Sequence, residues 1–564
     1  MSAPRTSFEI QVLTDKNWVI AEMATDEKSA LAFAENLLQS GNHAAVRVVR
    51  DYLRGDGLHA ETVIQEKKAP EKKAGDVSLS PVTEAPVCRE LGDFYKLDAR
   101  LTIGRMCRKY LDEVQVTPTE ILHSAAELKR FGDKGNLLFS AIDRISSLQA
   151  QATGEESKAR RDFLGKMWDE LSARARKAAE RKVPVPKTAA DVLAIKAGGG
   201  EDAEFLRGVA VSARLIESRS WIGKIDVLMT WASEDGVEPL MPLIDAVIAD
   251  IVVSAQLIQD LLGFQPNLAA ALTQLCDLAE GKAEAAKFAP ECFTLLNALF
   301  AAGRLPQARD VLLSRVAREL GGANPLSRNE PKLEYEMFHT LAHRLVSYEG
   351  GVLGGPAMAE ALVQRSSRVH NTGGNVSASQ AMESLLAALG DTCLRVQLML
   401  ALGLAPLAAT MGAALSTALV KKVREAATID AWVPVRVPPR DRMAALCAAN
   451  AALKATTVVA EDVRPALAAH VDEILAKYLL DAEVIEKIDK PDDPLAMRAI
   501  RLVKFCGSGV LIEGKSLNLA RQRVIDHLRQ PQFEEKFLAS CGDPAKGEKH
   551  LREFHKLLLE TGFR

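Results

Sequence analysis

Residues 295–320 read LLNALFAAGRLPQARDVLLSRVAREL. The stretch contains two runs rich in Leu and Ala, which are strong helix formers, on either side of a break that holds a Gly and a Pro. Two small residues near this break, Gly303 and Ala308, let two helices approach each other closely. We therefore expect two packed helices in this part of the chain.

The same helical pattern extends over most of the sequence. The chain has 564 residues, of which 48% are hydrophobic and only 5% aromatic, whereas a β-rich core needs many aromatic and β-branched side chains. One clear helix start is Thr117-Pro118-Thr119-Glu120, which fits a capping box. From about residue 96 onward we count roughly twenty helical segments, which predict a mostly α fold, either an α-solenoid or a large irregular bundle.

The turn of residues 295–320 resembles that of the tetratricopeptide repeat, because Gly303 and Ala308 have the glycine-to-alanine spacing of that family. No second clear copy follows at the period of the family, and its Trp and its closing Pro are missing here. The resemblance implies a helical-repeat scaffold that binds other proteins. It carries over no catalytic residues.

Residues 1–67 have a different pattern. Phe8, Ile10 and Val12 alternate with polar residues, which is typical of a half-buried strand. The further elements expected are a strand with Trp18 and Ile20, a helix that opens at 25–27, and strands at 46–49 and 62–65. The order β-β-α-β-β predicts a small α+β module of a size suited to docking a partner.

Composition divides the chain into five parts. They are the docking module at 1–67, a flexible linker at 68–95, a helical region with a basic helix at 96–190, a helical-repeat-like body at 191–430 and a C-terminal helical region at 431–564. The linker is rich in Pro, Lys, Glu and Ser and poor in large apolar residues. It therefore cannot bury enough surface to offset its ordering entropy.

The segment GVLIEGKS, residues 509–516, matches the phosphate-loop expression G-x-x-x-x-G-K-S. A bound phosphate would be held by Gly509, Gly514, Lys515 and Ser516. Such a loop follows a strand, but residues 495–506 have helical spacing. The alternative is that Gly514 breaks the chain and Ser516 caps the next helix.

Glu336, His339 and His343 are spaced so that they share one face of a helix. This arrangement is able to chelate zinc or to join a di-iron site, and a second Glu-x-x-His occurs at Glu120 and His123. On a helical wheel, however, the first three residues point largely away from the apolar stripe. That placement favours a solvated polar face.

Two segments raise the alternative of a membrane-associated protein. Residues 396–420 carry no charge and are long enough to span a bilayer, although Pro406 in the middle favours a pair of buried helices. Residues 155–187 are basic, but acidic residues are interspersed. This mixture favours an exposed helix that turns Phe163, Met167 and Leu171 inward.

Charge and cysteine usage bound the function. The net charge of −3 excludes a strongly basic nucleic-acid binder. The eight cysteines form no C-x-x-C pair and the first residues hold no apolar signal segment, so we expect reduced thiols and a cytoplasmic location. The sequence predicts no cofactor. We expect a non-enzymatic scaffold or adaptor for protein partners, with a membrane-associated protein and a metal- or nucleotide-dependent enzyme as alternatives.

Overall fold

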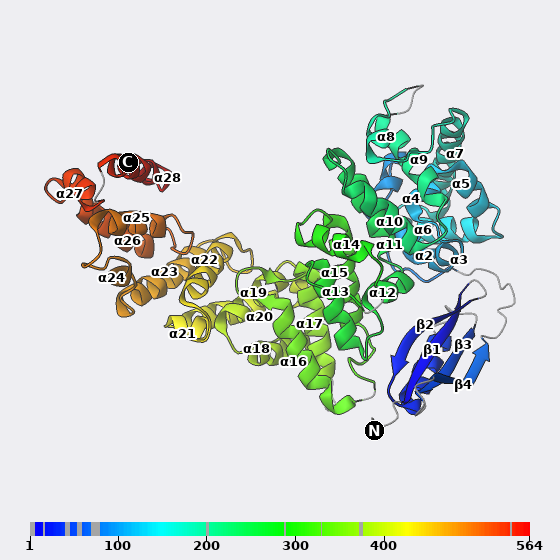
Figure 1. The fold of residues 1–564 in the computed structure, drawn as a ribbon, viewed down its shortest axis with the longest axis horizontal. Helices are drawn as coiled ribbons and strands as arrows, with labels where there is room; N and C mark the ends of the chain where they lie inside the picture. The colour runs from blue at the N-terminus through cyan, green and yellow to red at the C-terminus, as the bar shows by residue number, and fades with distance from the viewer. Residues whose placement is uncertain are drawn as a thin grey trace. The chain divides into compact units, whose positions relative to one another are not determined.

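The computed structural model describes residues 6–14, 17–39, 45–53, 59–68, 79–198, 202–286, 289–328, 330–370, 376–541 and 544–563. Helices dominate, and a four-stranded antiparallel sheet lies near the N-terminus (Figure 1). The predicted fold class, mostly α with a small N-terminal ββαββ module, is confirmed. The chain divides into two compact units, Met1–Leu240 with Ser254–Asp260 and Met241–Val253 with Leu261–Arg564.

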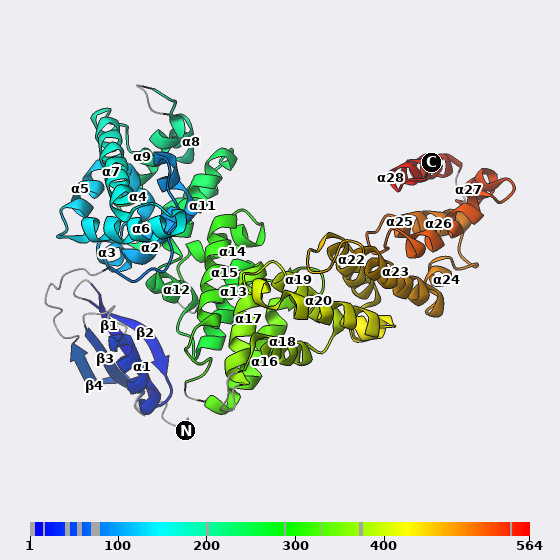
Figure 2. The ribbon, with the colours of Figure 1, turned by 180° about the vertical axis from the view of Figure 1, so that it is seen from behind.

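The N-terminal sheet has the strand order β2-β1-β3-β4, and all neighbouring strands are antiparallel. Its elements are β1 (Thr6–Thr14), β2 (Asn17–Ala24), α1 (Glu27–Gln39), β3 (Ala45–Leu53) and β4 (His59–Lys68). Helix α1 lies across one face (Figure 2). The small core between them contains Phe8, Ile10, Val12, Val46 and Val48 from the sheet with Ala30, Ala34 and Leu37 from α1.

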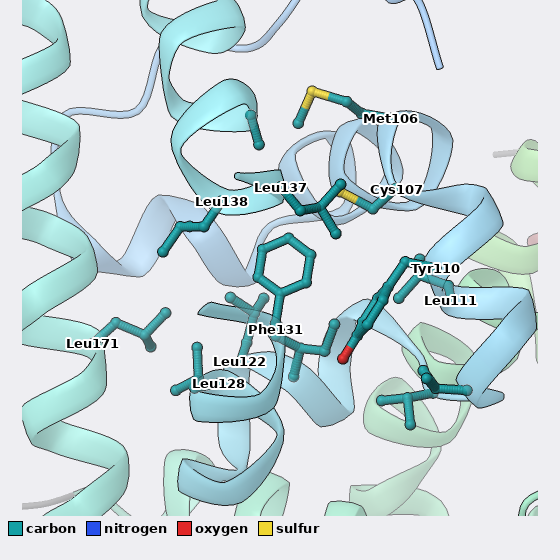
Figure 3. Close-up of a cluster of buried hydrophobic side chains, with 14 of the residues drawn as sticks. Met106, Cys107, Tyr110, Leu111, Leu122, Leu128, Phe131, Leu137, Leu138 and Leu171 are labelled. Atoms are coloured by element: carbon teal, nitrogen blue, oxygen red, sulfur yellow. The ribbon is translucent and has the colours of Figure 1, made fainter. Parts of the chain in front are cut away.

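The rest of the first unit is helical. Its elements are η1 (Leu91–Tyr95), α2 (Leu97–Met106), α3 (Arg108–Val114), α4 (Pro118–His123), α5 (Ala125–Gly132), α6 (Leu137–Thr153), α7 (Ser157–Glu180), α8 (Ala189–Leu193), α9 (Ala203–Ile216), α10 (Trp221–Ala232) and η2 (Glu238–Leu240). Helix α4 begins with the predicted capping box, since the Thr117 hydroxyl accepts a hydrogen bond of 3.0 Å from the Glu120 N–H. Figure 3 shows the core, where the ring of Tyr110 meets that of Phe131 edge-on at 5.3 Å.

The second half of the predicted linker is packed rather than free. Residues 69–78 lie outside the described residues, but Val82 and Cys88 are buried, and Leu91–Tyr95 forms η1. The guanidinium of Arg144 donates a hydrogen bond of 2.6 Å to the Val82 carbonyl. Composition did not indicate this packing, because much of the segment is held by hydrogen bonds that its backbone carbonyls accept, and not by large apolar side chains.

The basic helix is α7, and its inward stripe differs from the prediction by one residue. Met167 and Leu171 are buried as expected. Phe163 is 37% exposed, and Leu164 takes the inward position. The guanidinium of Arg160 lies 4.9 Å from the centre of the Phe163 ring, so the ring covers the arginine instead of entering the core.

The second unit is a succession of helices. After α11 (Met241–Ile251) and α12 (Ala255–Leu262), which lie at the division between the units, its elements are α13 (Leu268–Ala279), α14 (Cys292–Ala301), α15 (Pro306–Gly321), η3 (Pro331–Leu333), α16 (Glu334–Leu345), β5 (Val346–Ser347), β6 (Gly351–Val352), α17 (Gly355–Val369), α18 (Ala378–Leu389), α19 (Thr392–Leu402), α20 (Ala408–Glu425), α21 (Ile429–Trp432), α22 (Pro439–Ala455), α23 (Arg464–Asp481), α24 (Val484–Ile488), α25 (Leu495–Cys506), α26 (Lys515–Leu528), α27 (Phe533–Ser540) and α28 (Pro544–Glu560). Each helix packs mainly against helices a few places along the chain.

Residues 295–320 lie in α14 and α15, two helices with a break at residues 302–305. Helix α15 packs chiefly against α13 and α17. Gly303 has a φ of 67°, which favours glycine, and the space beside it is empty. Its role is therefore to reverse the chain after α14, not to permit the close approach that we predicted for it.

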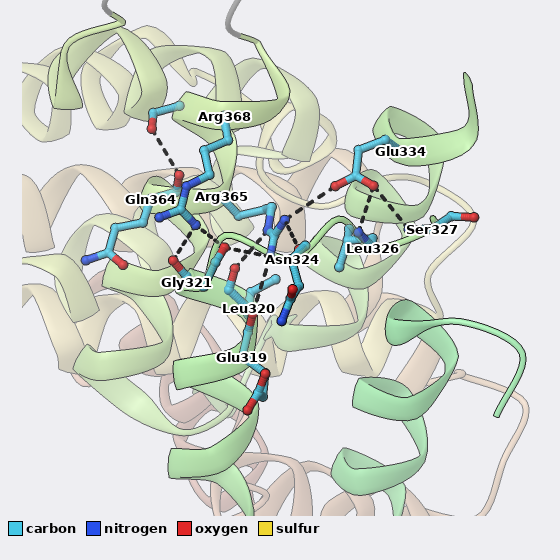
Figure 4. Close-up of polar contacts among 12 residues, drawn as sticks. Glu319, Leu320, Gly321, Asn324, Leu326, Ser327, Glu334, Gln364, Arg365 and Arg368 are labelled. Atoms are coloured by element: carbon cyan, nitrogen blue, oxygen red, sulfur yellow. Dashed lines mark hydrogen bonds and ion pairs between the residues drawn. The ribbon is translucent and has the colours of Figure 1, made fainter. Parts of the chain in front are cut away.

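A buried arginine joins α15 to α17. Arg365 is 1% exposed, and its guanidinium donates hydrogen bonds of 2.8 Å to the carbonyls of both Leu320 and Asn324 (Figure 4). The last carbonyls of a helix have no partner within it. Arg365 donates hydrogen bonds at this helix end. Its guanidinium also forms an ion pair with the Glu334 carboxylate, with an N–O distance of 3.4 Å.

Residues 396–420 do not form one helix. Helix α19 ends at Leu402 and α20 begins at Ala408, with Pro406 between them. The spanning-helix alternative for this segment is therefore wrong, and the broken pair is what the structure contains. Across the described residues, no single helix has both the length and the apolar character to cross a membrane. The bent pair of Glu238–Ile251 and Ala255–Leu262 has the required length and composition only when its two helices are taken together.

Candidate partner-binding surface and the predicted sites

The predicted phosphate loop lies between two helices, α25 and α26, so no strand precedes it. Helix α26 begins at Lys515. The carboxylate of Asp472, on α23, accepts hydrogen bonds from the backbone N–H groups of Lys515 and Ser516, the latter at 3.0 Å. The free N–H groups and the dipole of a helix N-terminus favour an anion. Here the chain's own carboxylate takes the position that a phosphate would need.

The other residues of the motif have structural roles. Gly514 has a φ of 153°, and a Cβ atom there would collide with the Asp472 carboxylate. The Lys515 ammonium pairs with Glu473. Ser516 does not cap α26 as expected, because its hydroxyl is buried and donates to the Ile512 carbonyl at 3.0 Å. The phosphate-binding prediction for Gly509, Gly514, Lys515 and Ser516 is thus not supported by the geometry.

Glu336, His339 and His343 lie on α16, as predicted, but they do not make a metal centre. The imidazole rings of His339 and His343 are 4.8 Å apart between centroids. The Nε2 atom of His343 lies 3.3 Å from the Ala388 carbonyl oxygen. Among the His, Cys, Asp and Glu residues that the structure describes, no three are grouped so that they could hold a metal ion.

The second Glu-x-x-His belongs to a buried cluster in the first unit. The Glu120 carboxylate pairs with the Lys224 ammonium, and both side chains are fully buried. Burial raises the pKa of Glu120 and lowers that of Lys224, while their mutual attraction acts in the opposite sense. Each charge is compensated by the other, which is the condition under which an interior tolerates charge. The pair therefore serves the packing of α4 against α10.

His123 is enclosed by rings. Its centroid lies 5.0 Å from that of Tyr95 and 5.3 Å from that of Phe205, and Gly208 on α9 lies directly against its edge. The Nδ1 atom is 2.8 Å from the Thr119 carbonyl, which can only accept, so Nδ1 carries the proton of the neutral ring. Burial lowers the pKa of His123 to about 4.

The cysteines are free thiols, all eight of them. Burial raises the pKa of several to about 12, namely Cys107, Cys276, Cys393 and Cys447. Since the thiolate is the nucleophile, these four are poorly reactive at neutral pH.

Strand register assigns a different candidate, on the face of the sheet opposite α1. Ile10 and Val12 face α1, so their neighbours in β1 face the other way. Residues directly opposite each other in antiparallel strands share a face. The open face, as we call it, therefore carries Glu9, Gln11, Leu13, Trp18, Ile20, Met23, Arg47, Val49 and Val63. Figure 1 views this side of the sheet and Figure 2 views the side of α1.

Apolar side chains are exposed on the open face. Ile20 is 38% exposed, Met23 is 41% and Val63 is 48%. An antiparallel sheet with one covered face usually turns polar residues outward on the other. Ile20 and Met23 lie on the edge strand β2 and Val63 lies on the edge strand β4, whereas Val49 on β3 is buried.

A polar row on the central strands β1 and β3 is held in one conformation. The side-chain amide of Gln11 donates a hydrogen bond of 2.7 Å to the Glu9 carboxylate, and Nε of Arg47 donates one of 2.8 Å to the side-chain oxygen Oε1 of Gln11. The Arg47 guanidinium lies 4.4 Å above the Trp18 ring. Trp and Arg dominate the binding energy of many protein interfaces. A Trp–Arg pair that is already positioned has less conformational entropy to lose on binding.

Sequence reasoning placed Trp18 and Ile20 in a strand but did not identify the open face. The residues that the sequence did not indicate as part of a binding surface are Met23, Arg47 and Val63. One signal was present: Trp18, Val19 and Ile20 are consecutive apolar residues, whereas a strand with one solvated face alternates. Comparison of the chain with protein-family models, with curated proteins and with solved structures finds no match.

Proposed function

We propose that the protein is a non-enzymatic adaptor that docks a protein partner on the open face of its N-terminal sheet. The observation that carries this proposal is the set of exposed apolar side chains, Ile20, Met23 and Val63, beside the stacked pair of Trp18 and Arg47. The polar row lies on the central strands β1 and β3, and the exposed apolar side chains lie on the edge strands β2 and β4, so a partner on this face would contact both kinds of group.

The partner surface should match this chemistry. It should supply apolar side chains to cover Ile20 and Met23. It should also supply a carboxylate, because Glu9 is already engaged by Gln11 and the Arg47 guanidinium on the central strand β3 is a further donor of hydrogen bonds. We therefore expect a segment that carries both apolar and acidic residues.

The helices of the second unit support a scaffold role. Their succession, in which near neighbours along the chain pack together, is the arrangement through which helical-repeat proteins offer long binding surfaces. In the adaptor that we propose, this body holds a second partner. The tetratricopeptide resemblance of residues 295–320 agrees with that role.

The test uses full-length protein as bait in native extract, with captured proteins identified by mass spectrometry. The variant is Ile20→Asp, which places a charge on the open face. Val19→Asp is its matched control, because Val19 is adjacent, 50% exposed and on the opposite face of the same strand. Circular dichroism checks that both variants are folded.

We expect a partner that binds the wild type and Val19→Asp and is lost with Ile20→Asp. Its dissociation constant, measured with purified protein, should rise at least tenfold, the equivalent of about 1.4 kcal/mol. Equal capture by all three proteins would refute docking on the open face. A partner lost with both variants would implicate the whole module rather than this face.

A further inference from the structure

The first unit contains an apolar cavity of about 80 Å³. It lies among α2, α4, α5, α6 and α7, and its walls include Ile103, Met106, Leu122, Phe131, Ile142 and Leu164. Figure 3 shows part of the surrounding core, with the Phe131 ring at its centre. Close-packed interiors leave few voids larger than a water molecule. This void is larger than the ~30 Å³ share of one water in the liquid.

The cavity is poorly suited to water. Besides the weakly polar thiols of Cys88 and Cys107 and the indole of Trp168, its wall contains one hydroxyl and one amide side chain, Thr102 and Gln149, and the latter two have partners already. The Thr102 hydroxyl donates 2.8 Å to the Asp98 carbonyl. The Gln149 amide donates to the Pro86 carbonyl, and its oxygen accepts from Arg160 at 2.8 Å. A buried water needs two to four polar partners, so this space favours an apolar occupant.

One wall of the cavity is a segment without long regular structure. We name residues 79–95 the strap, and Ala85, Pro86, Cys88 and Phe94 of the strap line the cavity. Three side chains from α6 and α7 fasten it through its backbone carbonyls. Arg144 donates a hydrogen bond to the Val82 carbonyl, Gln149 donates one to the Pro86 carbonyl and Arg160 donates one to the Cys88 carbonyl.

We propose that this cavity binds a small hydrocarbon group and that the strap is its gate. A 150 Å³ apolar cavity accommodates benzene, so ~80 Å³ accommodates about three or four carbons. The group is either a free small molecule or the tip of an acyl chain. The strap forms one wall of the cavity, so its movement would widen the entrance, and the contacts of Arg160 with the Cys88 carbonyl and with Gln149 help to hold it in place.

The first experiment uses xenon as the probe on full-length protein with labelled isoleucine methyl groups. We expect saturable shifts for the isoleucines of the wall, Ile103, Ile121, Ile142 and Ile145, and none for Ile225 or Ile248, which are buried elsewhere. Absence of saturable shifts at the wall would overturn the proposal.

Two alanine variants on α6 test whether the void itself is responsible. Ala141 lines the cavity and Ala150 does not, although both are buried. Ala141→Leu should fill the void, keep or raise the melting temperature and abolish the xenon shifts. Ala150→Leu should lower the melting temperature through overpacking and keep the shifts. Xenon shifts that persist in Ala141→Leu would overturn the site. If Ala141→Leu does not fold, displacement of xenon by n-butane from the wild type decides the same question.

Competition also identifies the source of the hydrocarbon group. Displacement of xenon by n-butane but not by octanoate supports a free small molecule. Displacement by both supports the tip of an acyl chain. Displacement by neither overturns the proposal.

The gate is tested through Cys107, a buried thiol in the cavity wall. Arg160→Met removes one of the three side-chain donors to the strap, and alkylation of Cys107 by a small thiol reagent should become about tenfold faster, as loss of a charged hydrogen bond implies. Arg161→Met is the matched control, because Arg161 is adjacent, 49% exposed and paired with Asp143. Equal rates in both variants would overturn the gate.

Discussion

The carboxylate of Asp472 accepts a hydrogen bond of 3.0 Å from the backbone N–H of Ser516, 44 residues further along the chain. A helix N-terminus that the sequence pattern assigns to phosphate is thereby satisfied from within the protein. The contact also joins α23 to α26, so it helps to order the C-terminal helices.

Replacement of Asp472 by alanine should loosen α26. Two backbone N–H groups would lose their charged acceptor, and we expect a cost of about 2 kcal/mol. Hydrogen exchange should accelerate across Lys515–Leu528. Glu473→Ala is the matched control: it removes an exposed ion pair with Lys515, and such pairs contribute less than about 1 kcal/mol. Equal effects of the two variants would contradict this assignment.

Nucleotide should not stabilise the protein. With Asp472 at the N-terminus of α26, the β- and γ-phosphates of ATP would meet a carboxylate instead of free N–H groups. We expect the same melting temperature with and without Mg-ATP, in the wild type and in Lys515→Ala. A rise in the wild type that Lys515→Ala removes would restore the phosphate-loop interpretation.

Gly208→Ala should destabilise the first unit although alanine is the better helix former. The helix propensity gain is at most about 1 kcal/mol. The added Cβ, however, would collide with the His123 ring, and overpacking of this kind costs about 1–3 kcal/mol. Thermal melts should show a lower transition temperature. The double variant Gly208→Ala/His123→Ala should be less destabilised than the sum of its single variants, and strict additivity would show that the two residues do not clash.

His123 should make stability depend on pH in a defined window. Its pKa in the folded protein is about 4, below the 6.5 of a free histidine, so the unfolded chain binds the extra proton first as pH falls. Stability from this residue is complete above pH 6.5 and is lost toward pH 4. The full difference is about 3 kcal/mol at most. Denaturation at pH 7 and pH 5 should therefore differ more in the wild type than in His123→Gln. If the stability difference between pH 7 and pH 5 is equal in the two proteins, a group other than His123 binds the proton.

The helices and the N-terminal sheet could be predicted because their signals are local. The capping box at Thr117 and the alternation through Phe8, Ile10 and Val12 each depend on neighbours a few residues away. The same holds for the break at Pro406, which divides residues 396–420 into α19 and α20.

The predictions that differ from the structure depend on distant residues. Nothing near Gly514 indicates that Asp472 will occupy the anion position. Likewise, the strap is held by Gln149 and Arg160, which lie more than 60 residues away from the carbonyls that they contact. The open face required strand register, since only the pairing of Gln11 with Ile20 reveals which side of the sheet Ile20 occupies.

The near-neighbour packing of the second unit has a consequence for how the protein is made. Contacts that join residues close in sequence have low contact order, and they form with little loop-closure entropy. A helix from α13 onward can therefore pack as soon as its near neighbours along the chain have left the ribosome. Arg365 is consistent with this order of folding. The carbonyls of Leu320 and Asn324, to which it donates hydrogen bonds, are synthesised before it, so these bonds can form as soon as Arg365 has been added.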